Sequence, residues 1–209
     1  MRDIAVKSIT TMLLLLAVST LNAGEYNEVL DIGDTAPQWK DLPGVDGKKH
    51  SLKDLKDKDV VVVVFTCNSC PYANDIEKRL DEFVKKHKDD KVALVAINVN
   101  KVEEDQFPAM KKRAKDKKYK YPYLYDETQQ IAKDYGALFT PEFFVLDKKR
   151  KVVYMGSMDD SPDGKKIKKR HVEDAVTASL KGGNPKVEET IAIGCLIRFE
   201  RKRRRRKSE

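Results

Sequence analysis

The sequence predicts an α/β fold of three layers, with a mixed central β-sheet and helices on both of its faces. Residues 60–65 and 92–97 are apolar runs rich in β-branched side chains, as expected of strands buried on both faces. Helical patterns follow each run, and two further strands, 142–146 and 152–156, are joined by the polar segment 147–150. This order combines parallel strands with an antiparallel hairpin in one sheet.

Turn signals precede the first buried strand. Residues 33–37, Gly-Asp-Thr-Ala-Pro, form a turn-rich entry to the domain, and the pair Asp46-Gly47 favours a tight hairpin turn. A short helical turn is predicted at 51–55. No internal repeat is visible, so we expect one continuous domain.

Helices are predicted between and after the strands. Ile76, Leu80 and Phe83 recur at steps of three and four residues, which places them on one apolar face of a helix. Further helices are predicted at 103–117, at 127–135 before Gly136, and at 169–180 before Gly182-Gly183. We attribute the alternating tyrosines of 119–125 to packing in the core and at the sheet edge rather than to a peptide-binding groove.

The length of 209 residues suits one domain with modest extensions. We place the domain at 24–185 and a C-terminal extension at 186–209. The formal net charge is +8, and the basic run 201–207 supplies seven of these charges, so the rest of the chain is nearly neutral. The overall positive charge therefore describes the tail rather than the domain.

The basic tail, 201–207, has three interpretations. It is a solvated charge run, a segment attracted to an anionic membrane or cell-envelope surface, or a non-specific contact to nucleic acid that releases counterions. Because no aromatic side chain interrupts the run, we expect no sequence-specific recognition of nucleic acid.

Residues 1–23 have the pattern of a secretory signal peptide. Arg2 and Lys7 precede the apolar run 12–18, and small and polar residues lead to Ala23, where we predict cleavage. The apolar run is shorter than the about 20 residues that span a bilayer. An uncleaved N-terminal anchor is the alternative, and in both cases we expect the domain to be exported, to the periplasm or outside the cell.

Cys67 and Cys70 form a Cys-x-x-Cys motif where a buried strand gives way to an amphipathic helix. Unpaired N–H groups and the positive end of the dipole at a helix start stabilise a thiolate, which predicts a lowered pKa and a nucleophilic role for Cys67. Cys70 lies in the first turn, close enough to resolve a mixed disulfide. The motif therefore predicts a thiol-disulfide couple.

Thr140-Pro141 directly precedes the strand 142–146, a position where proline is tolerated. A cis peptide bond here would bring this loop tightly against the cysteines, but the residues alone leave both isomers open. We assign Thr140 and Pro141 to positioning of the substrate backbone.

Motifs spread over about residues 30–197 carry a family resemblance. They are Gly33-Asp34-Thr35-Ala36-Pro37, Asp46-Gly47-Lys48, Ser51-Leu52, Phe65-Thr66-Cys67-Asn68-Ser69-Cys70-Pro71-Tyr72-Ala73, Ala93-Leu94-Val95-Ala96-Ile97-Asn98, the segment 122–129, Tyr135-Gly136-Ala137, Thr140-Pro141-Glu142-Phe143-Phe144-Val145 and Ile193-Gly194-Cys195. This set resembles the redoxin-domain, AhpC/TSA-like members of the thioredoxin superfamily. The resemblance implies a thioredoxin-like fold, a redox-active Cys67–Cys70 pair and a cis Pro141 beside it.

The sequence departs from the peroxiredoxin pattern at one point, and this makes a second function, that of a thiol peroxidase, less well supported. Peroxiredoxins have a threonine three residues before the cysteine that reduces peroxide, whereas Thr66 lies one residue before Cys67 and four before Cys70. We therefore expect a thiol-disulfide oxidoreductase acting on protein or small-molecule disulfides with a dithiol electron donor. A peroxidase is the first alternative, and a metal-binding or non-enzymatic binding module is the second.

Cys195 is left over when the other two cysteines pair. It is either a retained thiol in an extension that packs on the domain, or an accessory thiol that resolves a species at Cys67 or links two molecules. The three cysteines could bind metal with His50, His87 or His171, but no histidine has a typical ligand spacing and His87 is expected on a solvated helix. We predict no metal and no cofactor.

Overall fold

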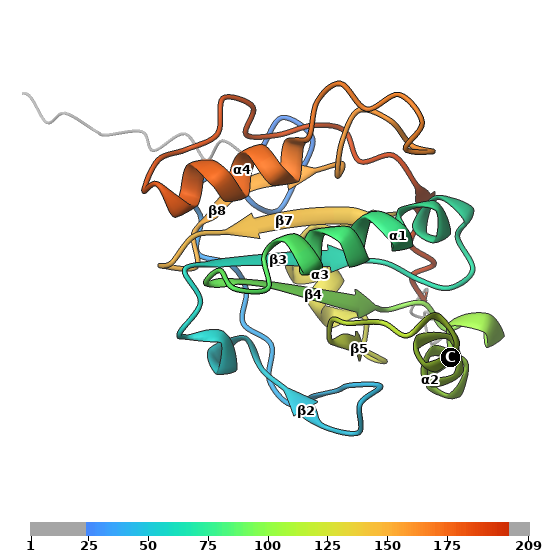
Figure 1. Cartoon of the computed structure of the whole chain (residues 1–209). Helices are drawn as coiled ribbons and strands as arrows, with labels where there is room; N and C mark the ends of the chain where they lie inside the picture. Colours follow the sequence, from blue (N-terminus) through green and yellow to red (C-terminus); the bar gives the residue numbers. More distant parts are fainter. Residues whose placement is uncertain (1–23, 201–209) are drawn as a thin grey trace, which may run out of the picture.

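The computed structural model describes residues 24–200, and its centre is a five-stranded sheet in the order β5-β4-β3-β7-β8 (Figure 1). The central strand β3 (Val60–Phe65) pairs parallel with β4 (Val92–Asn98) and antiparallel with β7 (Glu142–Leu146). β5 (Tyr123–Tyr125) extends the sheet in parallel beyond β4, and β8 (Val152–Gly156) extends it in antiparallel beyond β7. The predicted mixed sheet is confirmed.

Helices cover both faces of the sheet, which confirms the predicted three layers. On one face α1 (Pro71–Lys86), α2 (Phe107–Lys117) and α4 (His171–Leu180) contribute apolar side chains to a single core cluster. On the other face lie α3 (Gln130–Asp134) and the 3₁₀ helix η1 (Leu52–Leu55). Figure 1 shows α1 and α4 in front of the sheet and α3 behind it.

Strand β3 separates the two clusters and supplies side chains to both. Val60, Val62 and Val64 face the cluster with α1, whereas Val61, Val63 and Phe65 face the cluster with α3. All six are fully buried, and burial of each such side chain stabilises the fold by roughly 1.5–3 kcal/mol. Two-sided burial explains why this strand is an unbroken apolar run.

Two predicted helices are shorter than expected. In the segment 103–117 a 3₁₀ turn, η2 (Glu103–Asp105), comes first, and α2 begins only at Phe107 with proline in its first turn. The helix predicted at 127–135 is reduced to α3, because Asp126 accepts hydrogen bonds from the backbone N–H groups of Thr128 and Ile131 and forms a turn before it.

Two small antiparallel pairs complete the described structure. β1 (Leu42–Pro43) pairs with β2 (Lys49–His50) around Gly47, which has φ of 79° and confirms the predicted hairpin. β6 (Phe139–Thr140) pairs with β9 (Cys195–Leu196). The C-terminal segment 186–200 therefore packs on the domain and reaches the predicted site.

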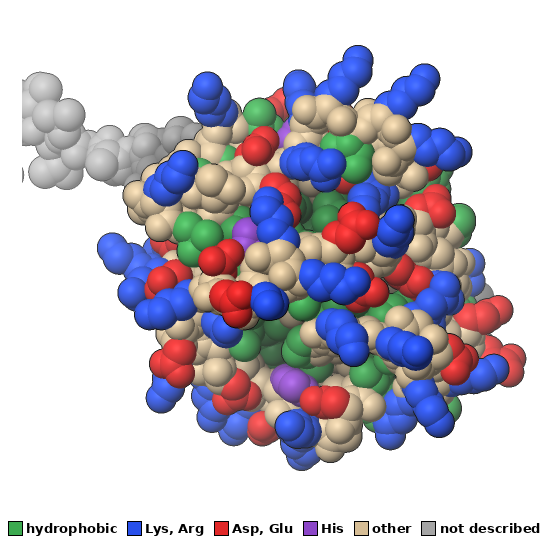
Figure 2. Space-filling model, in the orientation of Figure 1, with side chains coloured by type: hydrophobic (Ala, Val, Ile, Leu, Met, Phe, Trp, Pro, Cys, Tyr) green, Lys and Arg blue, Asp and Glu red, His purple; other side chains and the backbone are tan. Residues whose placement is uncertain are grey.

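The predicted signal peptide, 1–23, and the basic run 201–207 lie outside the described residues. Between residues 24 and 200, no helix is both long enough and apolar enough to cross a membrane. On the face shown in Figure 2, basic and acidic side chains are interspersed, in keeping with the nearly neutral charge of the chain without its tail.

Candidate active site

The two cysteines of the Cys-x-x-Cys motif lie where the central strand meets helix α1. β3 ends at Phe65 and α1 begins at Pro71, so Cys70 is the N-cap residue of the helix and Cys67 lies three residues before it. Both thiols are buried, with Cys67 4% and Cys70 2% exposed, and they form a small apolar cluster with Ala73. The structure thus brings both predicted residues together.

Thr140 contacts both thiols, from its side chain and from its backbone. Its Oγ1 lies 3.4 Å from Cys67 Sγ, and its carbonyl oxygen accepts a hydrogen bond from the neutral Cys70 thiol at 3.0 Å. The Thr140–Pro141 peptide bond is cis, as the family resemblance implies. Ser69 Oγ is a further neighbour of Cys67 Sγ, at 3.7 Å.

A hydrogen bond couples the ionisation of the two thiols. The thiol of Cys67 donates to Cys70, and this bond is the main reason that the pKa of Cys70 falls to about 5, against the opposing effect of burial. The same bond, together with burial, raises the pKa of Cys67. At neutral pH the pair therefore carries one negative charge and one shared proton.

Because the two thiols ionise as a coupled pair, the predicted nucleophilic role of Cys67 stays a prediction. After its hydrogen bond with Cys67, the position of Cys70 as the residue that caps α1 is a further cause of its lowered pKa. The backbone N–H of Ala73, in the first turn, donates to the Cys70 sulfur and lowers its pKa. Cys67 lies outside the helix, and the carboxylate of Asp105 further raises its pKa.

Cys195 joins the same cluster from the C-terminal segment. Its Sγ lies 2.8 Å from Cys70 Sγ, and its side chain is partly exposed. Burial, and then the hydrogen bond with Cys70, raise the pKa of Cys195 to about 11. The accessory role predicted for Cys195 was to resolve a species formed at Cys67, whereas its contact in the structure is with Cys70.

Asp105 is a site residue that the sequence analysis missed. Its fully buried carboxylate accepts hydrogen bonds from the backbone N–H groups of Asn68 (2.6 Å) and Ser69 (3.0 Å) and from the Ser69 hydroxyl (2.6 Å). It therefore fixes the two residues between the cysteines. In the sequence, Asp105 ends an acidic run that resembles a solvated surface turn.

A second set of hydrogen bonds holds Asn68 from the neighbouring strands. The Asn68 side chain donates to the Glu104 carbonyl at 2.7 Å and accepts from the Tyr123 hydroxyl at 3.0 Å. Asn98, at the end of β4, donates to Tyr123 Oη and to the Asp105 carbonyl, both at 3.2 Å. The ends of β4 and β5 and the loop between them thus support the motif.

Glu142 is a buried carboxyl directly after Pro141. It accepts hydrogen bonds from the backbone N–H groups of Leu138 and Phe139, both at 2.8 Å, and is 7% exposed. Burial raises its pKa from 4.5 to about 7, although the two backbone bonds oppose this rise. Glu142 therefore links the backbone before Thr140-Pro141, at residues 138 and 139, to the strand that follows it.

Comparison with known proteins agrees with this geometry. The model of the AhpC/TSA family matches residues 32–155. The chain belongs to this family. Its thioredoxin-like fold, which the sequence analysis predicted, is that of the similar solved structures.

Three proteins illustrate what this AhpC/TSA-family member is similar to. The thiol-disulfide oxidoreductase ResA of Bacillus cereus (strain ATCC 10987 / NRS 248) is 30% identical over 142 residues, which are 64% of this chain and 75% of ResA. An uncharacterized conserved protein from Geobacillus kaustophilus is 35% identical with a TM-score of 0.78, covering 84% of this chain and 96% of its own. A putative thiol:disulfide interchange protein DsbE from Chlorobium tepidum is 25% identical with a TM-score of 0.54, covering 60% and 84%.

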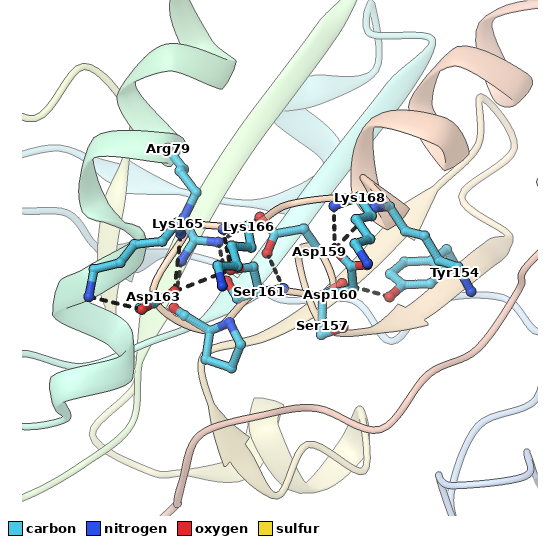
Figure 3. A network of polar contacts seen from close by, with 12 residues as sticks. Arg79, Tyr154, Ser157, Asp159, Asp160, Ser161, Asp163, Lys165, Lys166 and Lys168 are labelled. Atoms are coloured by element: carbon cyan, nitrogen blue, oxygen red, sulfur yellow. Dashed lines mark hydrogen bonds and ion pairs between the residues drawn. The ribbon is translucent and has the colours of Figure 1, made fainter.

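A pocket lies beside Pro141 in this AhpC/TSA-family protein, between α1 and the loop 157–169. Its lining includes Tyr72, Pro141, Met158 and Ile193. Arg79 of α1 fixes the loop, because it pairs with the buried Asp159 at 2.6 Å and donates to the carbonyls of residues 161 and 162 (Figure 3). Within the loop, the side chains of Asp159, Asp160, Ser161 and Asp163 accept hydrogen bonds from backbone N–H groups.

The three histidines have partners away from the thiols. His50 contacts Asp46, His87 lies between Asp90 and Glu173, and the His171 ring stacks on Tyr154. His87 is 7% exposed at the end of α1, so its predicted position on a solvated helix surface is wrong; the helix turns it inward against Phe83. In the described part of the chain, no set of three or more His, Cys, Asp or Glu side chains is arranged to hold a metal ion.

Proposed function

We propose that this AhpC/TSA-family protein is a thiol-disulfide oxidoreductase whose redox couple is Cys67–Cys70. The observation that carries the proposal is the pair of buried thiols at the start of α1, both in contact with Thr140. The similarity to the thiol-disulfide oxidoreductase ResA supports the same class of reaction.

The first step is attack by the Cys67 thiolate on a substrate disulfide. The shared proton moves to Cys70, where the Thr140 carbonyl accepts the S–H, while the Thr140 hydroxyl donates to the charged Cys67 sulfur. A bond forms between Cys67 Sγ and one substrate sulfur. The substrate S–S bond breaks, and the other substrate sulfur leaves as a thiolate.

The second step closes the protein disulfide. The Cys70 thiolate attacks Cys67 Sγ in the mixed disulfide, and the second substrate sulfur leaves. The substrate thiolate released in the first step takes the proton from Cys70, which leaves the Cys70 sulfur ionised for this attack. The substrate gains two electrons and two protons, one proton from Cys70 and one from solvent. A dithiol donor then restores the reduced pair, and in the reverse direction the same couple oxidises dithiols.

Substrates of this couple are protein or small-molecule disulfides. For a peptide substrate, we assign presentation of the backbone to Thr140 and Pro141, since the pocket beside Pro141 lies next to the cysteine-bearing end of α1.

Trapping of the mixed disulfide tests the proposal. The Cys70→Ser/Cys195→Ser variant, mixed with a disulfide-containing peptide, is expected to retain the peptide on Cys67 in a product that dithiothreitol releases. The Cys67→Ser/Cys195→Ser variant is the matched control. Because it lacks the proposed nucleophile, it should form no mixed disulfide with the peptide. Failure of both wild-type turnover and trapping, or consumption of peroxide in place of disulfide, would contradict the proposal.

We also propose that the domain acts after export, with the predicted leader 1–23 removed and the basic tail 201–207 drawn to an anionic envelope surface. The support is the sequence pattern of these two segments. Fractionation of cells that make the full chain, with N-terminal sequencing, should find a mature protein that begins after Ala23. A protein that remains in the cytoplasm with Met1 or residue 2 at its start would contradict export.

A further inference from the structure

We propose that Cys195 is a third redox thiol, which exchanges with the pair through Cys70 and forms a Cys70–Cys195 disulfide. The inference rests on the proposed Cys67–Cys70 couple and extends it from two thiols to three. The separation of 2.8 Å between the Sγ atoms of Cys70 and Cys195 carries it.

The position of Cys195 is built into the fold. Cys195 is the register partner of Thr140 in the β6–β9 pair, so the strand that holds Cys195 pairs with the residue that touches both thiols of the couple. The backbone N–H of Ile197 donates to the Leu138 carbonyl at 2.7 Å, and the Ile197 side chain is buried. The strand is therefore anchored immediately after Cys195.

Gly194 lets this strand approach the Thr140-Pro141 loop. A Cβ atom at position 194 would lie 2.2 Å from the Thr140 carbonyl oxygen and 2.6 Å from its carbon, closer than real Cβ atoms come. Any larger residue must push the strand away. Glycine at 194 thus places Cys195 beside Cys70.

Exposure differs among the three thiols in a way that suits a relay. Cys67 and Cys70 are buried, whereas Cys195 is partly exposed. An external dithiol or disulfide therefore reacts first with Cys195, and Cys195 then exchanges with the buried pair.

The exchange needs no external oxidant. The Cys195 thiolate attacks Cys70 Sγ in the Cys67–Cys70 disulfide; the Cys70–Cys195 bond forms, the Cys67–Cys70 bond breaks, and the electron pair leaves on Cys67 Sγ. Cys67 takes up one proton for the proton that Cys195 gives up. The number of disulfides is unchanged, and the reverse step restores the original pair.

Disulfide mapping in variants that lack one of the three cysteines tests the proposal. The Cys67→Ser variant, equilibrated with a series of oxidised and reduced dithiothreitol, should lose both alkylatable thiols and yield one peptide pair linking residues 70 and 195. Cys67→Ala serves the same test if the serine variant does not fold. Two free thiols in these folded variants, at ratios that oxidise Cys195→Ser fully, would overturn the inference.

A double variant separates geometry from mere reactivity. Cys67→Ser/Gly194→Val retains Cys70 and Cys195 but moves β9 outward, so the Cys70–Cys195 disulfide is expected to be lost. An undiminished yield of the Cys70–Cys195 disulfide would overturn the role of β9 in placing Cys195 beside Cys70. The proposed function is read separately, from formation of the Cys67–Cys70 disulfide in Cys195→Ser, so that each claim can fail without the other.

Discussion

The charge of the thiol pair depends on one hydrogen bond, from Cys67 to Cys70. Because this bond is the main cause of the low pKa of Cys70, the Cys67→Ala variant should raise the pKa of Cys70 from about 5 toward its ordinary value of 9. Ultraviolet absorbance of the thiolate against pH measures it. Cys195→Ser, which removes a lesser contact, should give a smaller rise; identical titrations of wild type and Cys67→Ala would contradict this assignment.

Glu142 makes stability depend on pH. Its pKa is raised in the folded protein from 4.5 to about 7, so the folded state binds the proton more tightly than the unfolded state. The group's contribution to stability is thus fully present below pH 4.5 and is lost as pH rises to about 7. The loss should amount to about 3 kcal/mol in the free energy of unfolding.

The Glu142→Gln variant isolates this contribution. The amide keeps an oxygen that accepts the backbone N–H groups of residues 138 and 139 but has no charge to desolvate. Urea unfolding across this pH range should therefore show a smaller decline for the variant than for wild type. Parallel declines in the two proteins would show that another group is responsible.

At the scale of elements, the turn η2 controls the couple through Asp105. The Asp105 carboxylate raises the pKa of Cys67, so the Asp105→Asn variant should stabilise thiolate and make the couple more oxidising, by about 30 mV for each tenfold change in equilibrium constant. Equilibration with dithiothreitol measures the shift. Glu104→Gln, at an exposed neighbour, is the control, and an equal shift in both variants would rule out a specific role for Asp105.

The loop 157–169 depends on its attachment to α1. Arg79 and Asp159 form a buried ion pair, and loss of one partner leaves an uncompensated charge, which typically costs about 3–5 kcal/mol. Arg79→Ala should reduce the free energy of unfolding by that amount in urea. Lys78→Ala, at the exposed neighbouring position, should change it by less than about 1 kcal/mol; equal effects of the two variants would contradict the structural role of Arg79.

Sequence patterns predicted elements well where local chemistry determines them. The valine run of β3, the Asp46-Gly47 turn and the helix after the cysteines all follow from burial, turn type and periodicity. The sequence did not predict which residue begins α1. That single position decides that Cys70, and not Cys67, caps the helix.

At the scale of the whole molecule, the site joins segments that are far apart in the chain. Cys70 meets Thr140 and Cys195, and the backbone of Asn68 meets Asp105, through the packing of strand ends and the C-terminal segment. The sequence indicated Cys67, Cys70, Thr140 and Pro141 by motif. It could not indicate Asp105, because an acidic turn looks the same whether it faces solvent or a buried loop.

The most direct test of the account is a redox titration of the Cys67–Cys70 couple in the Cys195→Ser protein. The protein is equilibrated with oxidised and reduced dithiothreitol, and its free thiols are alkylated and counted by mass. We predict a reversible two-electron transition in which one disulfide joins residues 67 and 70. Two thiols that stay reduced across the whole series would contradict a redox function for the pair.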